Sequence, residues 1–595
     1  MLFGKNVNRY YIKYLPWLLF GVAALIAVDW LQLRIPVMYR LVVNGINYGE
    51  AEYNGATVPF DMDFLLQNVC LPMIFIIFAM VLCRFLWRIC FFGTAIKVET
   101  DIRSRMFDVC KDLSQEYYSR NKVGGLMSLF TNDLETIHEC FGPGILMFAD
   151  ALFLGGMALY KMARMNPLLT LLSLAPMLLL LAAGIILGRF MAKKWRKRQE
   201  AFSSLSDFSQ ESFAGIAVIK AFVKEAKELS AFRRLNKENE KANVDFTRLS
   251  VALNITVTLF VESVVCIILG YGGYLVWSGV FNAGQLIEFI SYFTATVWPV
   301  MAVSQLIDLR SRGKASLGRI DELLDSVPDV ADSANVADPG ELRGGIEFRH
   351  LSFRYPGTER DVLSDVSFVI EPGESVGIVG RTGAGKTTLV DLILRTYNVP
   401  DGTLFVDGHD VNAVPIESVR RNAAYVPQDN FLFSDTIESN IAFASDGEAA
   451  SSVERAALLS DVHENIASFP QGYKTVLGER GVTVSGGQKQ RISIARAIMK
   501  DAPILILDDS VSAVDVETEK HILDNLKRIR EGRTTLIIAH RISTVEKTDK
   551  IVFLENGRVI AVGAPAQLYE TCPEFRRMVD LQRLDELDPG AKGGE

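Results

Sequence analysis

The sequence predicts a chain in two parts, an all-α membrane domain of six helices followed by an α/β domain. Two observations predict this architecture. Apolar segments long enough to cross ~30 Å of hydrocarbon as helices recur through residues 1–310. Beyond residue 343 the pattern changes to short apolar runs that alternate with helical patterns and turn residues. The length of 595 residues also exceeds what one hydrophobic core can organise, so at least two domains are expected.

Six segments of the first part are expected to span the membrane. The stretches Phe64–Cys83 and Leu168–Gly188 contain no charged residue. The expected spans cover about residues 14–36, 64–92, 141–163, 167–190, 251–279 and 284–308. The first of them is too long for a signal-peptide core and lacks a small-residue cleavage site. After them we expect a polar linker at 311–343, the α/β domain at 344–585 and a tail at 586–595.

The placement of basic residues predicts the orientation of the spans. Five lysines and arginines lie within residues 193–198, after the fourth span, and the N-terminus is also basic. The loop 37–63 instead carries Glu50, Glu52, Asp61 and Asp63 against the single Arg40. Because basic loops stay on the cytoplasmic side, both termini and the α/β domain are expected in the cytoplasm. The chain is therefore expected to be a multi-pass protein of the cytoplasmic membrane, in contact with membrane lipids.

A phosphate-binding loop opens the second part. It fits the pattern G-x-x-x-x-G-K-[ST], follows an apolar run at 375–379 that is typical of a buried strand, and precedes a helical pattern at 387–396. Its consecutive N–H groups and the positive end of the helix suit nucleotide phosphates, with Lys386 reaching the β- and γ-phosphates and Thr387 binding Mg²⁺. The loop comprises Gly380, Arg381, Thr382, Gly383, Ala384, Gly385, Lys386, Thr387 and Thr388.

Three further motifs fit a nucleotide site. Asp508 ends the apolar run 504–508, and a carboxylate at the end of a strand beside the phosphate loop can hold Mg²⁺. Tyr355 precedes the loop and offers a ring for stacking on a base, with ordinary core packing as the alternative. A third motif lies at the start of the helical stretch 489–500. Its serine and glycines suit the binding of a phosphate at the helix N-terminus, and a simple glycine-rich helix cap is the alternative. This third motif consists of Ser485, Gly486, Gly487 and Gln488.

Four acidic residues fall inside the expected spans, where an ionisable group is costly and is a candidate for function. Acids facing a common cavity would suit a cationic amphiphile. Pairing with Arg84 or Arg88, or reaching an interface through helix tilt, is the alternative. Trp298 and the other tryptophans near span ends are expected mainly as interfacial anchors, with the lining of a cavity as the alternative. The four acids are Asp29, Asp150, Glu262 and Glu288.

Composition narrows the classes of function. The net charge of −8 argues against nucleic acid as the main partner. The seven cysteines form no Cys-x-x-Cys motif and lie mostly in or beside apolar runs, so they are expected to be small buried hydrophobic residues.

Taken together, these motifs resemble those of the ATP-binding cassette family. The phosphate loop, Gln428, the signature Val484–Gln488, Asp508, the segment 512–515 and His540 occur in the family's order. The membrane half looks like the six-helix exporter type, and the residues 479–481 before the signature are typical of exporters. Over nearly the whole chain, from about residue 14 to 585, the resemblance implies an exporter-type transmembrane domain fused to an α/β P-loop nucleotide-binding domain.

The resemblance also implies how such a protein works. Two chains would sandwich each ATP, with Mg²⁺, between the phosphate loop of one chain and the signature of the other. Gln428 would bind Mg²⁺ and sense the attacking water, His540 would contact the γ-phosphate, and Asp515 would communicate across the dimer. The cytoplasmic loops at about 93–140 and 191–250 have helix-rich patterns and are expected to extend the spans as helices. The resemblance implies that their turns carry motion between the nucleotide domain and the spans. Substrates of such exporters are amphiphilic drugs, lipids or peptides.

One residue departs from the family pattern. Asp509 stands after Asp508 where the family usually has Glu, the residue that positions or activates the attacking water. Its carboxylate is shorter by one methylene, so the chain's own site is expected to bind ATP and to hydrolyse it poorly. Because the signature is nearly regular, we expect a heterodimer in which a second half-transporter carries the catalytic Glu. A homodimeric lipid flippase or exporter, a non-transporting regulatory ATP-binding membrane protein and an importer are the alternatives.

Overall fold

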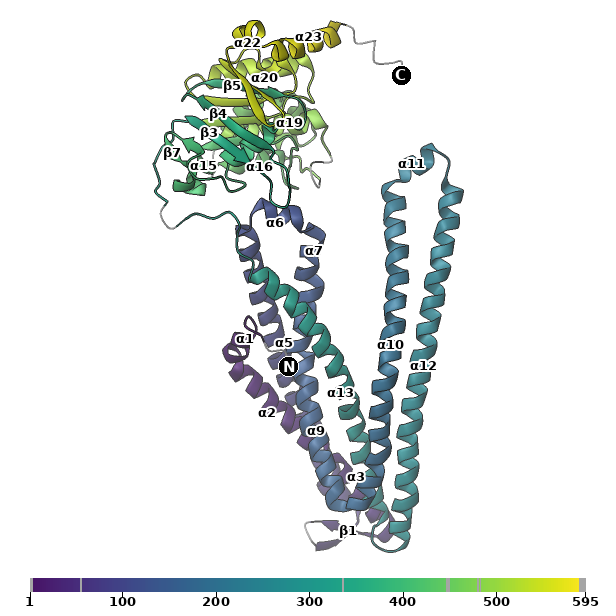
Figure 1. The fold of residues 1–595 in the computed structure, drawn as a ribbon. Helices are drawn as coiled ribbons and strands as arrows, with labels where there is room; N and C mark the ends of the chain where they lie inside the picture. Colours follow the sequence, from purple (N-terminus) through teal and green to yellow (C-terminus); the bar gives the residue numbers. More distant parts are fainter. Residues whose placement is uncertain are drawn as a thin grey trace. The chain divides into compact units, whose positions relative to one another are not determined.

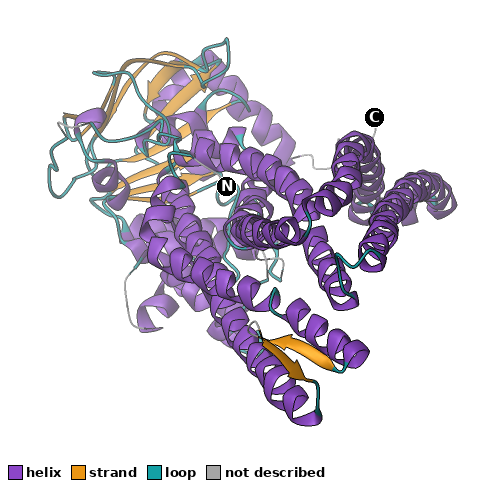
Figure 2. Cartoon of the chain, turned by 90° about the horizontal axis from the view of Figure 1, so that it is seen from below, coloured by secondary structure: helices purple, strands orange, loops and turns teal. Residues whose placement is uncertain are grey.

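The computed structural model describes residues 4–587 apart from 54–55, 334–335, 446–449, 479–480 and 482. The chain divides into two compact units, which are considered separately. One comprises Met1–Lys111 and Gly124–Ser326, and the other comprises Asp112–Val123 and Val327–Glu595. The first unit is helical apart from a short hairpin of β1 (Glu50–Tyr53) and β2 (Ala56–Pro59), whereas the second contains the two larger sheets (Figure 2).

The described part of the first unit contains five stretches that are long and apolar enough to cross a membrane. A further apolar stretch, Pro167–Met177, begins another long helix. The five are Leu15–Tyr48, Met62–Asp112, Val123–Met165, Glu225–Trp277 and Ala283–Leu324. The longer helices within these six stretches are α2 (Leu15–Gln32), α3 (Ile35–Tyr48), α5 (Leu71–Asp112), α9 (Pro143–Met165), α10 (Pro167–Ala214), α12 (Glu225–Trp277) and α13 (Ala283–Leu324).

The first expected span, 14–36, is broken rather than continuous. Helix α2 ends at Gln32, and α3 begins at Ile35 and continues to Tyr48. Pro36, in the first turn of α3, lacks an N–H and disfavours helical backbone before it, which explains the break at this point. The membrane-facing helix therefore runs further than the apolar pattern indicated, into the loop expected outside.

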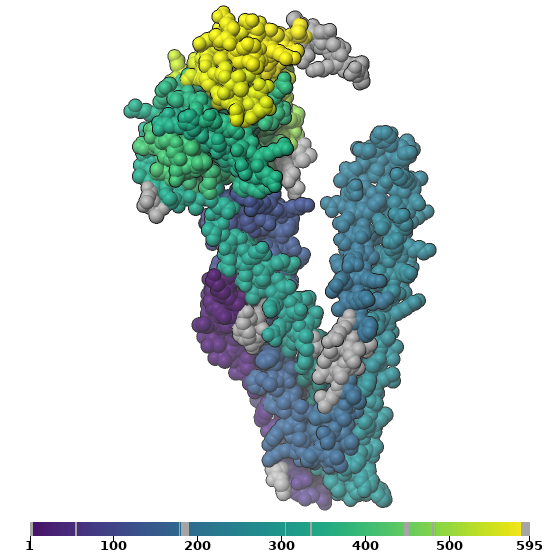
Figure 3. Space-filling view, viewed as in Figure 1, coloured from purple at the N-terminus to yellow at the C-terminus, as the bar shows by residue number. Residues whose placement is uncertain are grey.

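The expected cytoplasmic loops are largely extensions of helices. Helices α10 and α12 contain 48 and 53 residues, which correspond to ~72 and ~80 Å. They pack against each other, and the short α11 (Ile216–Ala221) lies at the turn between them (Figure 1). Phe202 and Phe213 on α10 and Phe232 on α12 remain exposed, on the arm that Figure 3 draws in blue. A single chain thus leaves apolar side chains of this arm uncovered.

The polar linker expected at 311–343 is also partly helical. Helix α13 continues to Leu324 because Leu317, Ile320 and Leu323 keep an apolar face that is buried. The division between the two units falls at Ser326 and Val327, later than the expected boundary at 310.

The second unit is built on a six-stranded sheet of order β12-β11-β5-β10-β9-β8. Its strands from β11 to β8 are parallel and bury apolar side chains on both faces, while β12 pairs antiparallel at one edge. The bounds are β5 Ser375–Gly380, β8 Ala423–Val426, β9 Ile504–Asp508, β10 Thr534–Ile538, β11 Lys550–Glu555 and β12 Arg558–Gly563.

A smaller antiparallel sheet completes this unit, in the order β4-β3-β6-β7. It shares one hydrophobic core with the six-stranded sheet. Its bounds are β3 Ile346–Phe353, β4 Leu363–Ile370, β6 Leu404–Val406 and β7 His409–Asp410.

A segment from the membrane half of the sequence belongs to the second unit. Helix α6 (Gln115–Arg120) lies in the 112–123 stretch, which the domain boundaries expected from the sequence had assigned to residues 1–310. Within this unit the hydroxyl of Ser114 donates to a carboxylate oxygen of Asp329 at 3.4 Å. The turn of the first long cytoplasmic loop is therefore bound to the nucleotide-domain side of the linker.

Candidate functional site

The parallel strands of the large sheet end at one edge, and four of them, β5, β8, β9 and β10, each deliver a predicted nucleotide-site residue there. Gly380 ends β5 and starts the phosphate loop, and Asp508 ends β9. Gln428 follows β8, and His540 follows β10. Ile538 of β10 stands opposite both Ile378 of β5 and Asp508 of β9, so the strand ends are in step. Because ligands bind at the carboxyl ends of parallel strands, this edge is the candidate site.

The phosphate loop holds its lysine in a defined position. The Nζ of Lys386 donates to the carbonyl oxygens of Gly380 at 2.9 Å and Arg381 at 3.2 Å, and the residue is 6% exposed. Gly385 adopts φ +96°, where a Cβ would lie 2.6 Å from Leu363, so glycine is required at this position. Burial lowers the pKa of Lys386, whereas the nearby carboxylates of Asp508 and Asp509 oppose that change. The loop thus holds an ammonium group at the end of β5.

The residues predicted to bind Mg²⁺ fit a hard cation. Asp508 is 1% exposed, and its Oδ2 has no hydrogen-bond partner, while its side chain interacts with the hydroxyl of Thr387. Burial raises the pKa of Asp508, and Lys386 and His540 oppose the rise. No group of three or more His, Cys, Asp or Glu side chains suited to a metal occurs among the described residues. Two protein oxygens completed by phosphates are the kind of set that Mg²⁺ accepts.

Asp509 lies directly beside this carboxylate. Its backbone is left-handed, with φ +46°, and its N–H donates to the carbonyl of Ile538 at 2.9 Å. Its own carbonyl accepts from the hydroxyl of Ser512 at 2.9 Å. The backbone is therefore fixed between β9 and β10, so the reach of the carboxylate is set by its side-chain length.

Gln428 and His540 are exposed at the same edge. The His540 carbonyl accepts from the side chain of Gln582 at 2.8 Å, which holds its backbone. Both side chains are free to meet a nucleotide or the attacking water, as a sensor of bound phosphate must be.

Tyr355 is half-buried, and its ring is not free in this structure. Its hydroxyl lies 2.9 Å from the Thr388 hydroxyl, and its ring packs edge-on against Phe353 and Tyr397. The alternative interpretation, core packing, describes this arrangement. The position beside the helix of the phosphate loop is also where a base-stacking ring belongs.

Asp391 was not singled out from the sequence. It lies on α14 (Lys386–Ile393), close to the Tyr355 hydroxyl, and its only sequence signal is an acid in an otherwise apolar helix. Burial, followed by the charge of Asp508, raises the pKa of Asp391 to about 6. The helix itself ends before the expected residue 396 because Arg395 adopts φ +48° and the N–H of Thr396 bonds back to Asp391.

Asp391→Asn is expected to stabilise the nucleotide-free protein at pH 8. The folded pKa of about 6 lies above the ordinary value of 3.8, so the stability linked to this group is complete only below pH 3.8 and is lost as the pH rises through about 6. Asparagine carries no charge to bury, so the substitution should raise the free energy of unfolding at pH 8 by about 1–2 kcal/mol for a partly exposed group. Thermal unfolding of the full-length protein at pH 5 and pH 8 measures this. The gain in stability should be smaller at pH 5 than at pH 8. The control Glu531→Gln, at an exposed position, should give no gain at either pH. Equal gains at both pH values in Asp391→Asn would contradict the raised pKa of Asp391.

The signature residues form the start of α19 (Gly486–Lys500). The Gln488 N–H donates to the Ser485 hydroxyl at 3.3 Å, and the Ser485 N–H donates to the Gln488 side chain at 3.0 Å. This capping box matches the glycine-rich cap that was the structural alternative. A Cβ on Gly487 would lie 3.0 Å from the carbonyl oxygen of Ala513, whereas a Cβ on Gly486 would have no other atom within 4 Å. The start of the helix stays accessible at Gly486, as binding to a phosphate on another chain requires.

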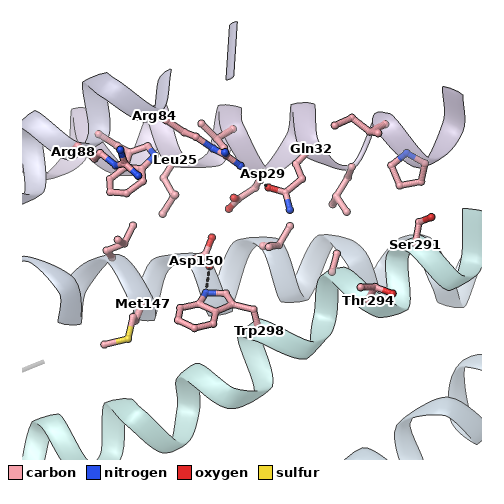
Figure 4. Close-up of a pocket in the computed structure, with 18 of the residues that line it drawn as sticks. Leu25, Asp29, Gln32, Arg84, Arg88, Met147, Asp150, Ser291, Thr294 and Trp298 are labelled. Carbon is pink, nitrogen blue, oxygen red and sulfur yellow. Dashed lines mark hydrogen bonds between the residues drawn. The ribbon is translucent and has the colours of Figure 1, made fainter. Parts of the chain in front are cut away.

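A cavity of about 550 Å³ lies among the membrane helices of the first unit (Figure 4). Helices α2, α3, α5, α9 and α13 contribute its walls. Asp29 and Asp150, both predicted substrate contacts, line it together with Arg84 and Arg88. Trp298, expected mainly at an interface, lies on the wall, and its indole N–H donates to Asp150 at 2.8 Å.

The other two predicted acids lie outside this cavity. Glu288 is 4% exposed, its Oε2 lies 3.1 Å from an Arg40 nitrogen, and its Oε1 accepts from the Tyr292 hydroxyl at 2.8 Å. An ion-pair role therefore fits Glu288, with Arg40 as partner rather than the expected Arg84 or Arg88. Glu262 is exposed on α12.

Comparison with known proteins agrees with this geometry. Residues 18–300 match the family model of the ABC transporter transmembrane region, and residues 363–512 match the family model described as ABC transporter. The fold is that of a solved bacterial Atm1-family ABC exporter with ATP bound, at a TM-score of 0.76 and 25% identity, covering 97% of this chain and 99% of that one. The predicted fold class is confirmed.

Relatives that align with this chain over most of both lengths show that it is an ABC transporter. A probable multidrug resistance ABC transporter of Bacillus subtilis is 33% identical over 99% of both chains. A multidrug resistance-like ATP-binding protein of Escherichia coli is 34% identical over 95% of this chain and 94% of its own length. An ATP-dependent lipid A-core flippase of Syntrophus aciditrophicus is 34% identical over 82% of this chain and 80% of its own length.

The chain belongs to the ATP-binding cassette transporters, in the exporter form that fuses one membrane domain to one nucleotide domain. It is an ATPase-coupled transporter that binds ATP. It resides in the cell membrane with several spans, and its nucleotide domain lies on the cytoplasmic side.

Proposed function

We propose that this chain is the half-transporter with the slow ATP site in a heterodimer that exports amphiphilic compounds across the cytoplasmic membrane. The observation that supports the proposal most directly is Asp509. It lies beside the Mg²⁺-type carboxylate Asp508, on a backbone fixed by the Ile538 carbonyl. The multidrug and lipid names of the relatives support amphiphiles as the class of cargo.

The length of the Asp509 side chain sets the rate at the chain's own site. With its backbone fixed, an aspartate carboxylate retreats by ~1 Å relative to a glutamate at the same position. Misplacement on this scale costs ~10²-fold in rate. The shorter Asp509 side chain leaves ATP binding unaffected, because the phosphate loop is present in full and holds Lys386 in place.

The remaining groups keep their roles toward bound ATP. Thr387 and Asp508 would hold Mg²⁺, which neutralises charge on the phosphates, with Gln428 as a further contact. Lys386 binds the phosphates, His540 contacts the terminal phosphate, and Tyr355 stacks on the base after its hydroxyl leaves Thr388. The accessible start of α19, with Ser485, Gly486, Gly487 and Gln488, serves the ATP held by the partner's phosphate loop.

A dimer of half-transporters is supported by the uncovered arm of α10 and α12. Phe202, Phe213 and Phe232 remain exposed along helices that leave the bilayer region. A partner with a catalytic Glu would supply the competent site, to which this chain lends its signature. Membrane lipids surround the spans, and no role for nucleic acid is proposed.

The second candidate is a homodimeric lipid flippase or exporter. It is favoured by the relatives named as lipid A-core flippases, 34% and 35% identical to this chain, and by the presence of Gln428 and His540. A regulatory protein without transport has less support because residues 18–300 match the ABC transporter transmembrane region.

Reconstitution into proteoliposomes tests the proposal. This chain, alone and with a second half-transporter that carries Glu at the position of Asp509, is assayed for ATP-dependent movement of cationic dyes, labelled lipids and peptides. Transport of amphiphiles only by the pair supports the proposal. Efficient lipid movement by this chain alone supports the flippase, and ATP binding without any transport supports a regulatory role.

A further inference from the structure

The membrane cavity contains a buried carboxyl group, Asp29, with one oxygen that no protein group satisfies. Asp29 is 1% exposed, its Oδ2 makes no hydrogen bond, and its side chain lies at the space between α2 and α9 (Figure 4). A buried acceptor left unpaired is costly, and more so when it is charged. A ligand in the cavity that donates a hydrogen bond to Oδ2 of Asp29 would therefore remove this cost.

Asp150 places a second carboxyl group next to Asp29, which favours a positively charged hydrogen-bond donor at this site. Its carboxyl group lies within hydrogen-bond reach of Asp29, from the facing helix α9. The Trp298 indole orients it by donating to its Oδ2 at 2.8 Å. Two carboxyl groups this close must share a proton or hold a cation between them, because both cannot be ionised and unpaired.

The arginines of the cavity do not fill this role. Arg84 donates to the Gln32 side chain at 3.4 Å, and Arg88 lies over the Trp87 ring at 5.4 Å from its centroid. Among the described residues, neither arginine forms an ion pair within 4.0 Å with Asp29 or Asp150. The charge of Arg84 attracts both carboxyl groups, but the free oxygen of Asp29 still receives no hydrogen bond from the protein.

The rest of the cavity suits the apolar part of an amphiphile. Leu25, Val28, Leu146 and Leu154 form its walls together with the ring of Trp87. A volume of about 550 Å³ is in the range of sites that enclose a drug-sized molecule.

We propose that this cavity is a binding site for an amphiphile with a protonated amine that carries at least one N–H. The N–H donates to the free Asp29 oxygen, the positive charge lies between Asp29 and Asp150, and the apolar body contacts the leucine walls. The site takes a proton-bearing ammonium in preference to a quaternary one, because only the former satisfies the unpaired oxygen. The inference rests on the proposed function in taking the occupant to be cargo.

Equilibrium binding without ATP tests the site separately from transport. A fluorescent tertiary amine, protonated at neutral pH, and its N-methyl quaternary analogue are titrated against the full-length transporter in nanodiscs. The protonated amine should bind about tenfold or more tightly than the quaternary analogue. Equal affinities would overturn the role of the N–H, and this comparison needs no variant.

Matched variants locate the site. Asp29→Asn should weaken amine binding by about tenfold or more and should bring the two analogues to similar affinity. Glu262→Gln, an exposed acid outside the cavity, should leave both affinities unchanged. Unchanged binding in Asp29→Asn and Asp150→Asn would place the amine elsewhere and overturn the inference.

The binding and transport results separate the two proposals. Amine binding that depends on Asp29 in a protein that transports nothing would retain the site and reject export. ATP-driven export of amphiphiles that ignores Asp29 and Asp150 would retain export and reject the site.

Discussion

Ser485→Arg in this chain is expected to reduce ATP hydrolysis by the assembled transporter to about a tenth or less of the unmodified rate. In the proposed heterodimer, the start of α19 contacts the ATP of the partner's competent site. An arginine there obstructs the open approach beside Gly486 and removes the hydroxyl that, in the proposed dimer, would meet the phosphates. Asp509→Asn in the same chain should change total hydrolysis by no more than about twofold, because the site that it alters is already slow.

Control variants separate this effect from loss of the helix cap. Ser485 also accepts from the Gln488 N–H, so its loss costs about 1 kcal/mol of local stability. Ser485→Thr keeps the hydroxyl and should retain most activity, and thermal unfolding should show Ser485→Arg to be folded. If Asp509→Asn abolished hydrolysis and Ser485→Arg spared it, the assignment of slow and competent sites would be reversed.

Asp509→Glu is expected to raise hydrolysis at this chain's own site by up to ~10²-fold. The added methylene returns the carboxylate to the place from which it can position water, while the backbone stays fixed by Ile538 and Ser512. In the intact pair the total rate should rise only modestly, because the partner's site already turns over. The gain is best measured in pairs whose partner carries Gln instead of its catalytic Glu.

Asp509→Asn serves as the matched control for this gain. It preserves side-chain length but removes the charge, so it should give no rise in the same background. A rise in both variants would mean that the carboxylate of Asp509 hinders hydrolysis rather than falling short of the water. No change in Asp509→Glu would show that the length of this side chain does not limit the rate.

Local sequence determined the parts of the fold that depend on neighbours in the chain. The phosphate loop could be predicted because β5 and α14 flank it directly, and Gly385 is required by its own φ and the approach of Leu363. The helix-rich pattern of residues 191–250 indicated that α10 and α12 extend the spans, but their ends could not be predicted from hydropathy, since charged residues continue the helices beyond the apolar stretch. The break before Pro36 was visible only as a single proline within an apolar run.

The site residues divide in the same way. Asp508, Gln428 and His540 could be assigned from motif order, because parallel strands end at the same edge of a sheet. The pairing of Asp29 with Asp150 could not, since it depends on how α2 packs against α9. The raised pKa of Asp391 likewise depends on burial and on the charge of Asp508, which lies more than one hundred residues away in sequence.

ATP hydrolysis by the purified chain alone tests the central claim most directly. The full-length protein in nanodiscs, without any second half-transporter, should bind ATP through Lys386 and hydrolyse it only slowly. Its rate should rise when a partner with Glu at the position of Asp509 is added. Vigorous, cooperative hydrolysis by the single chain, lost on Asp509→Asn, would contradict the account.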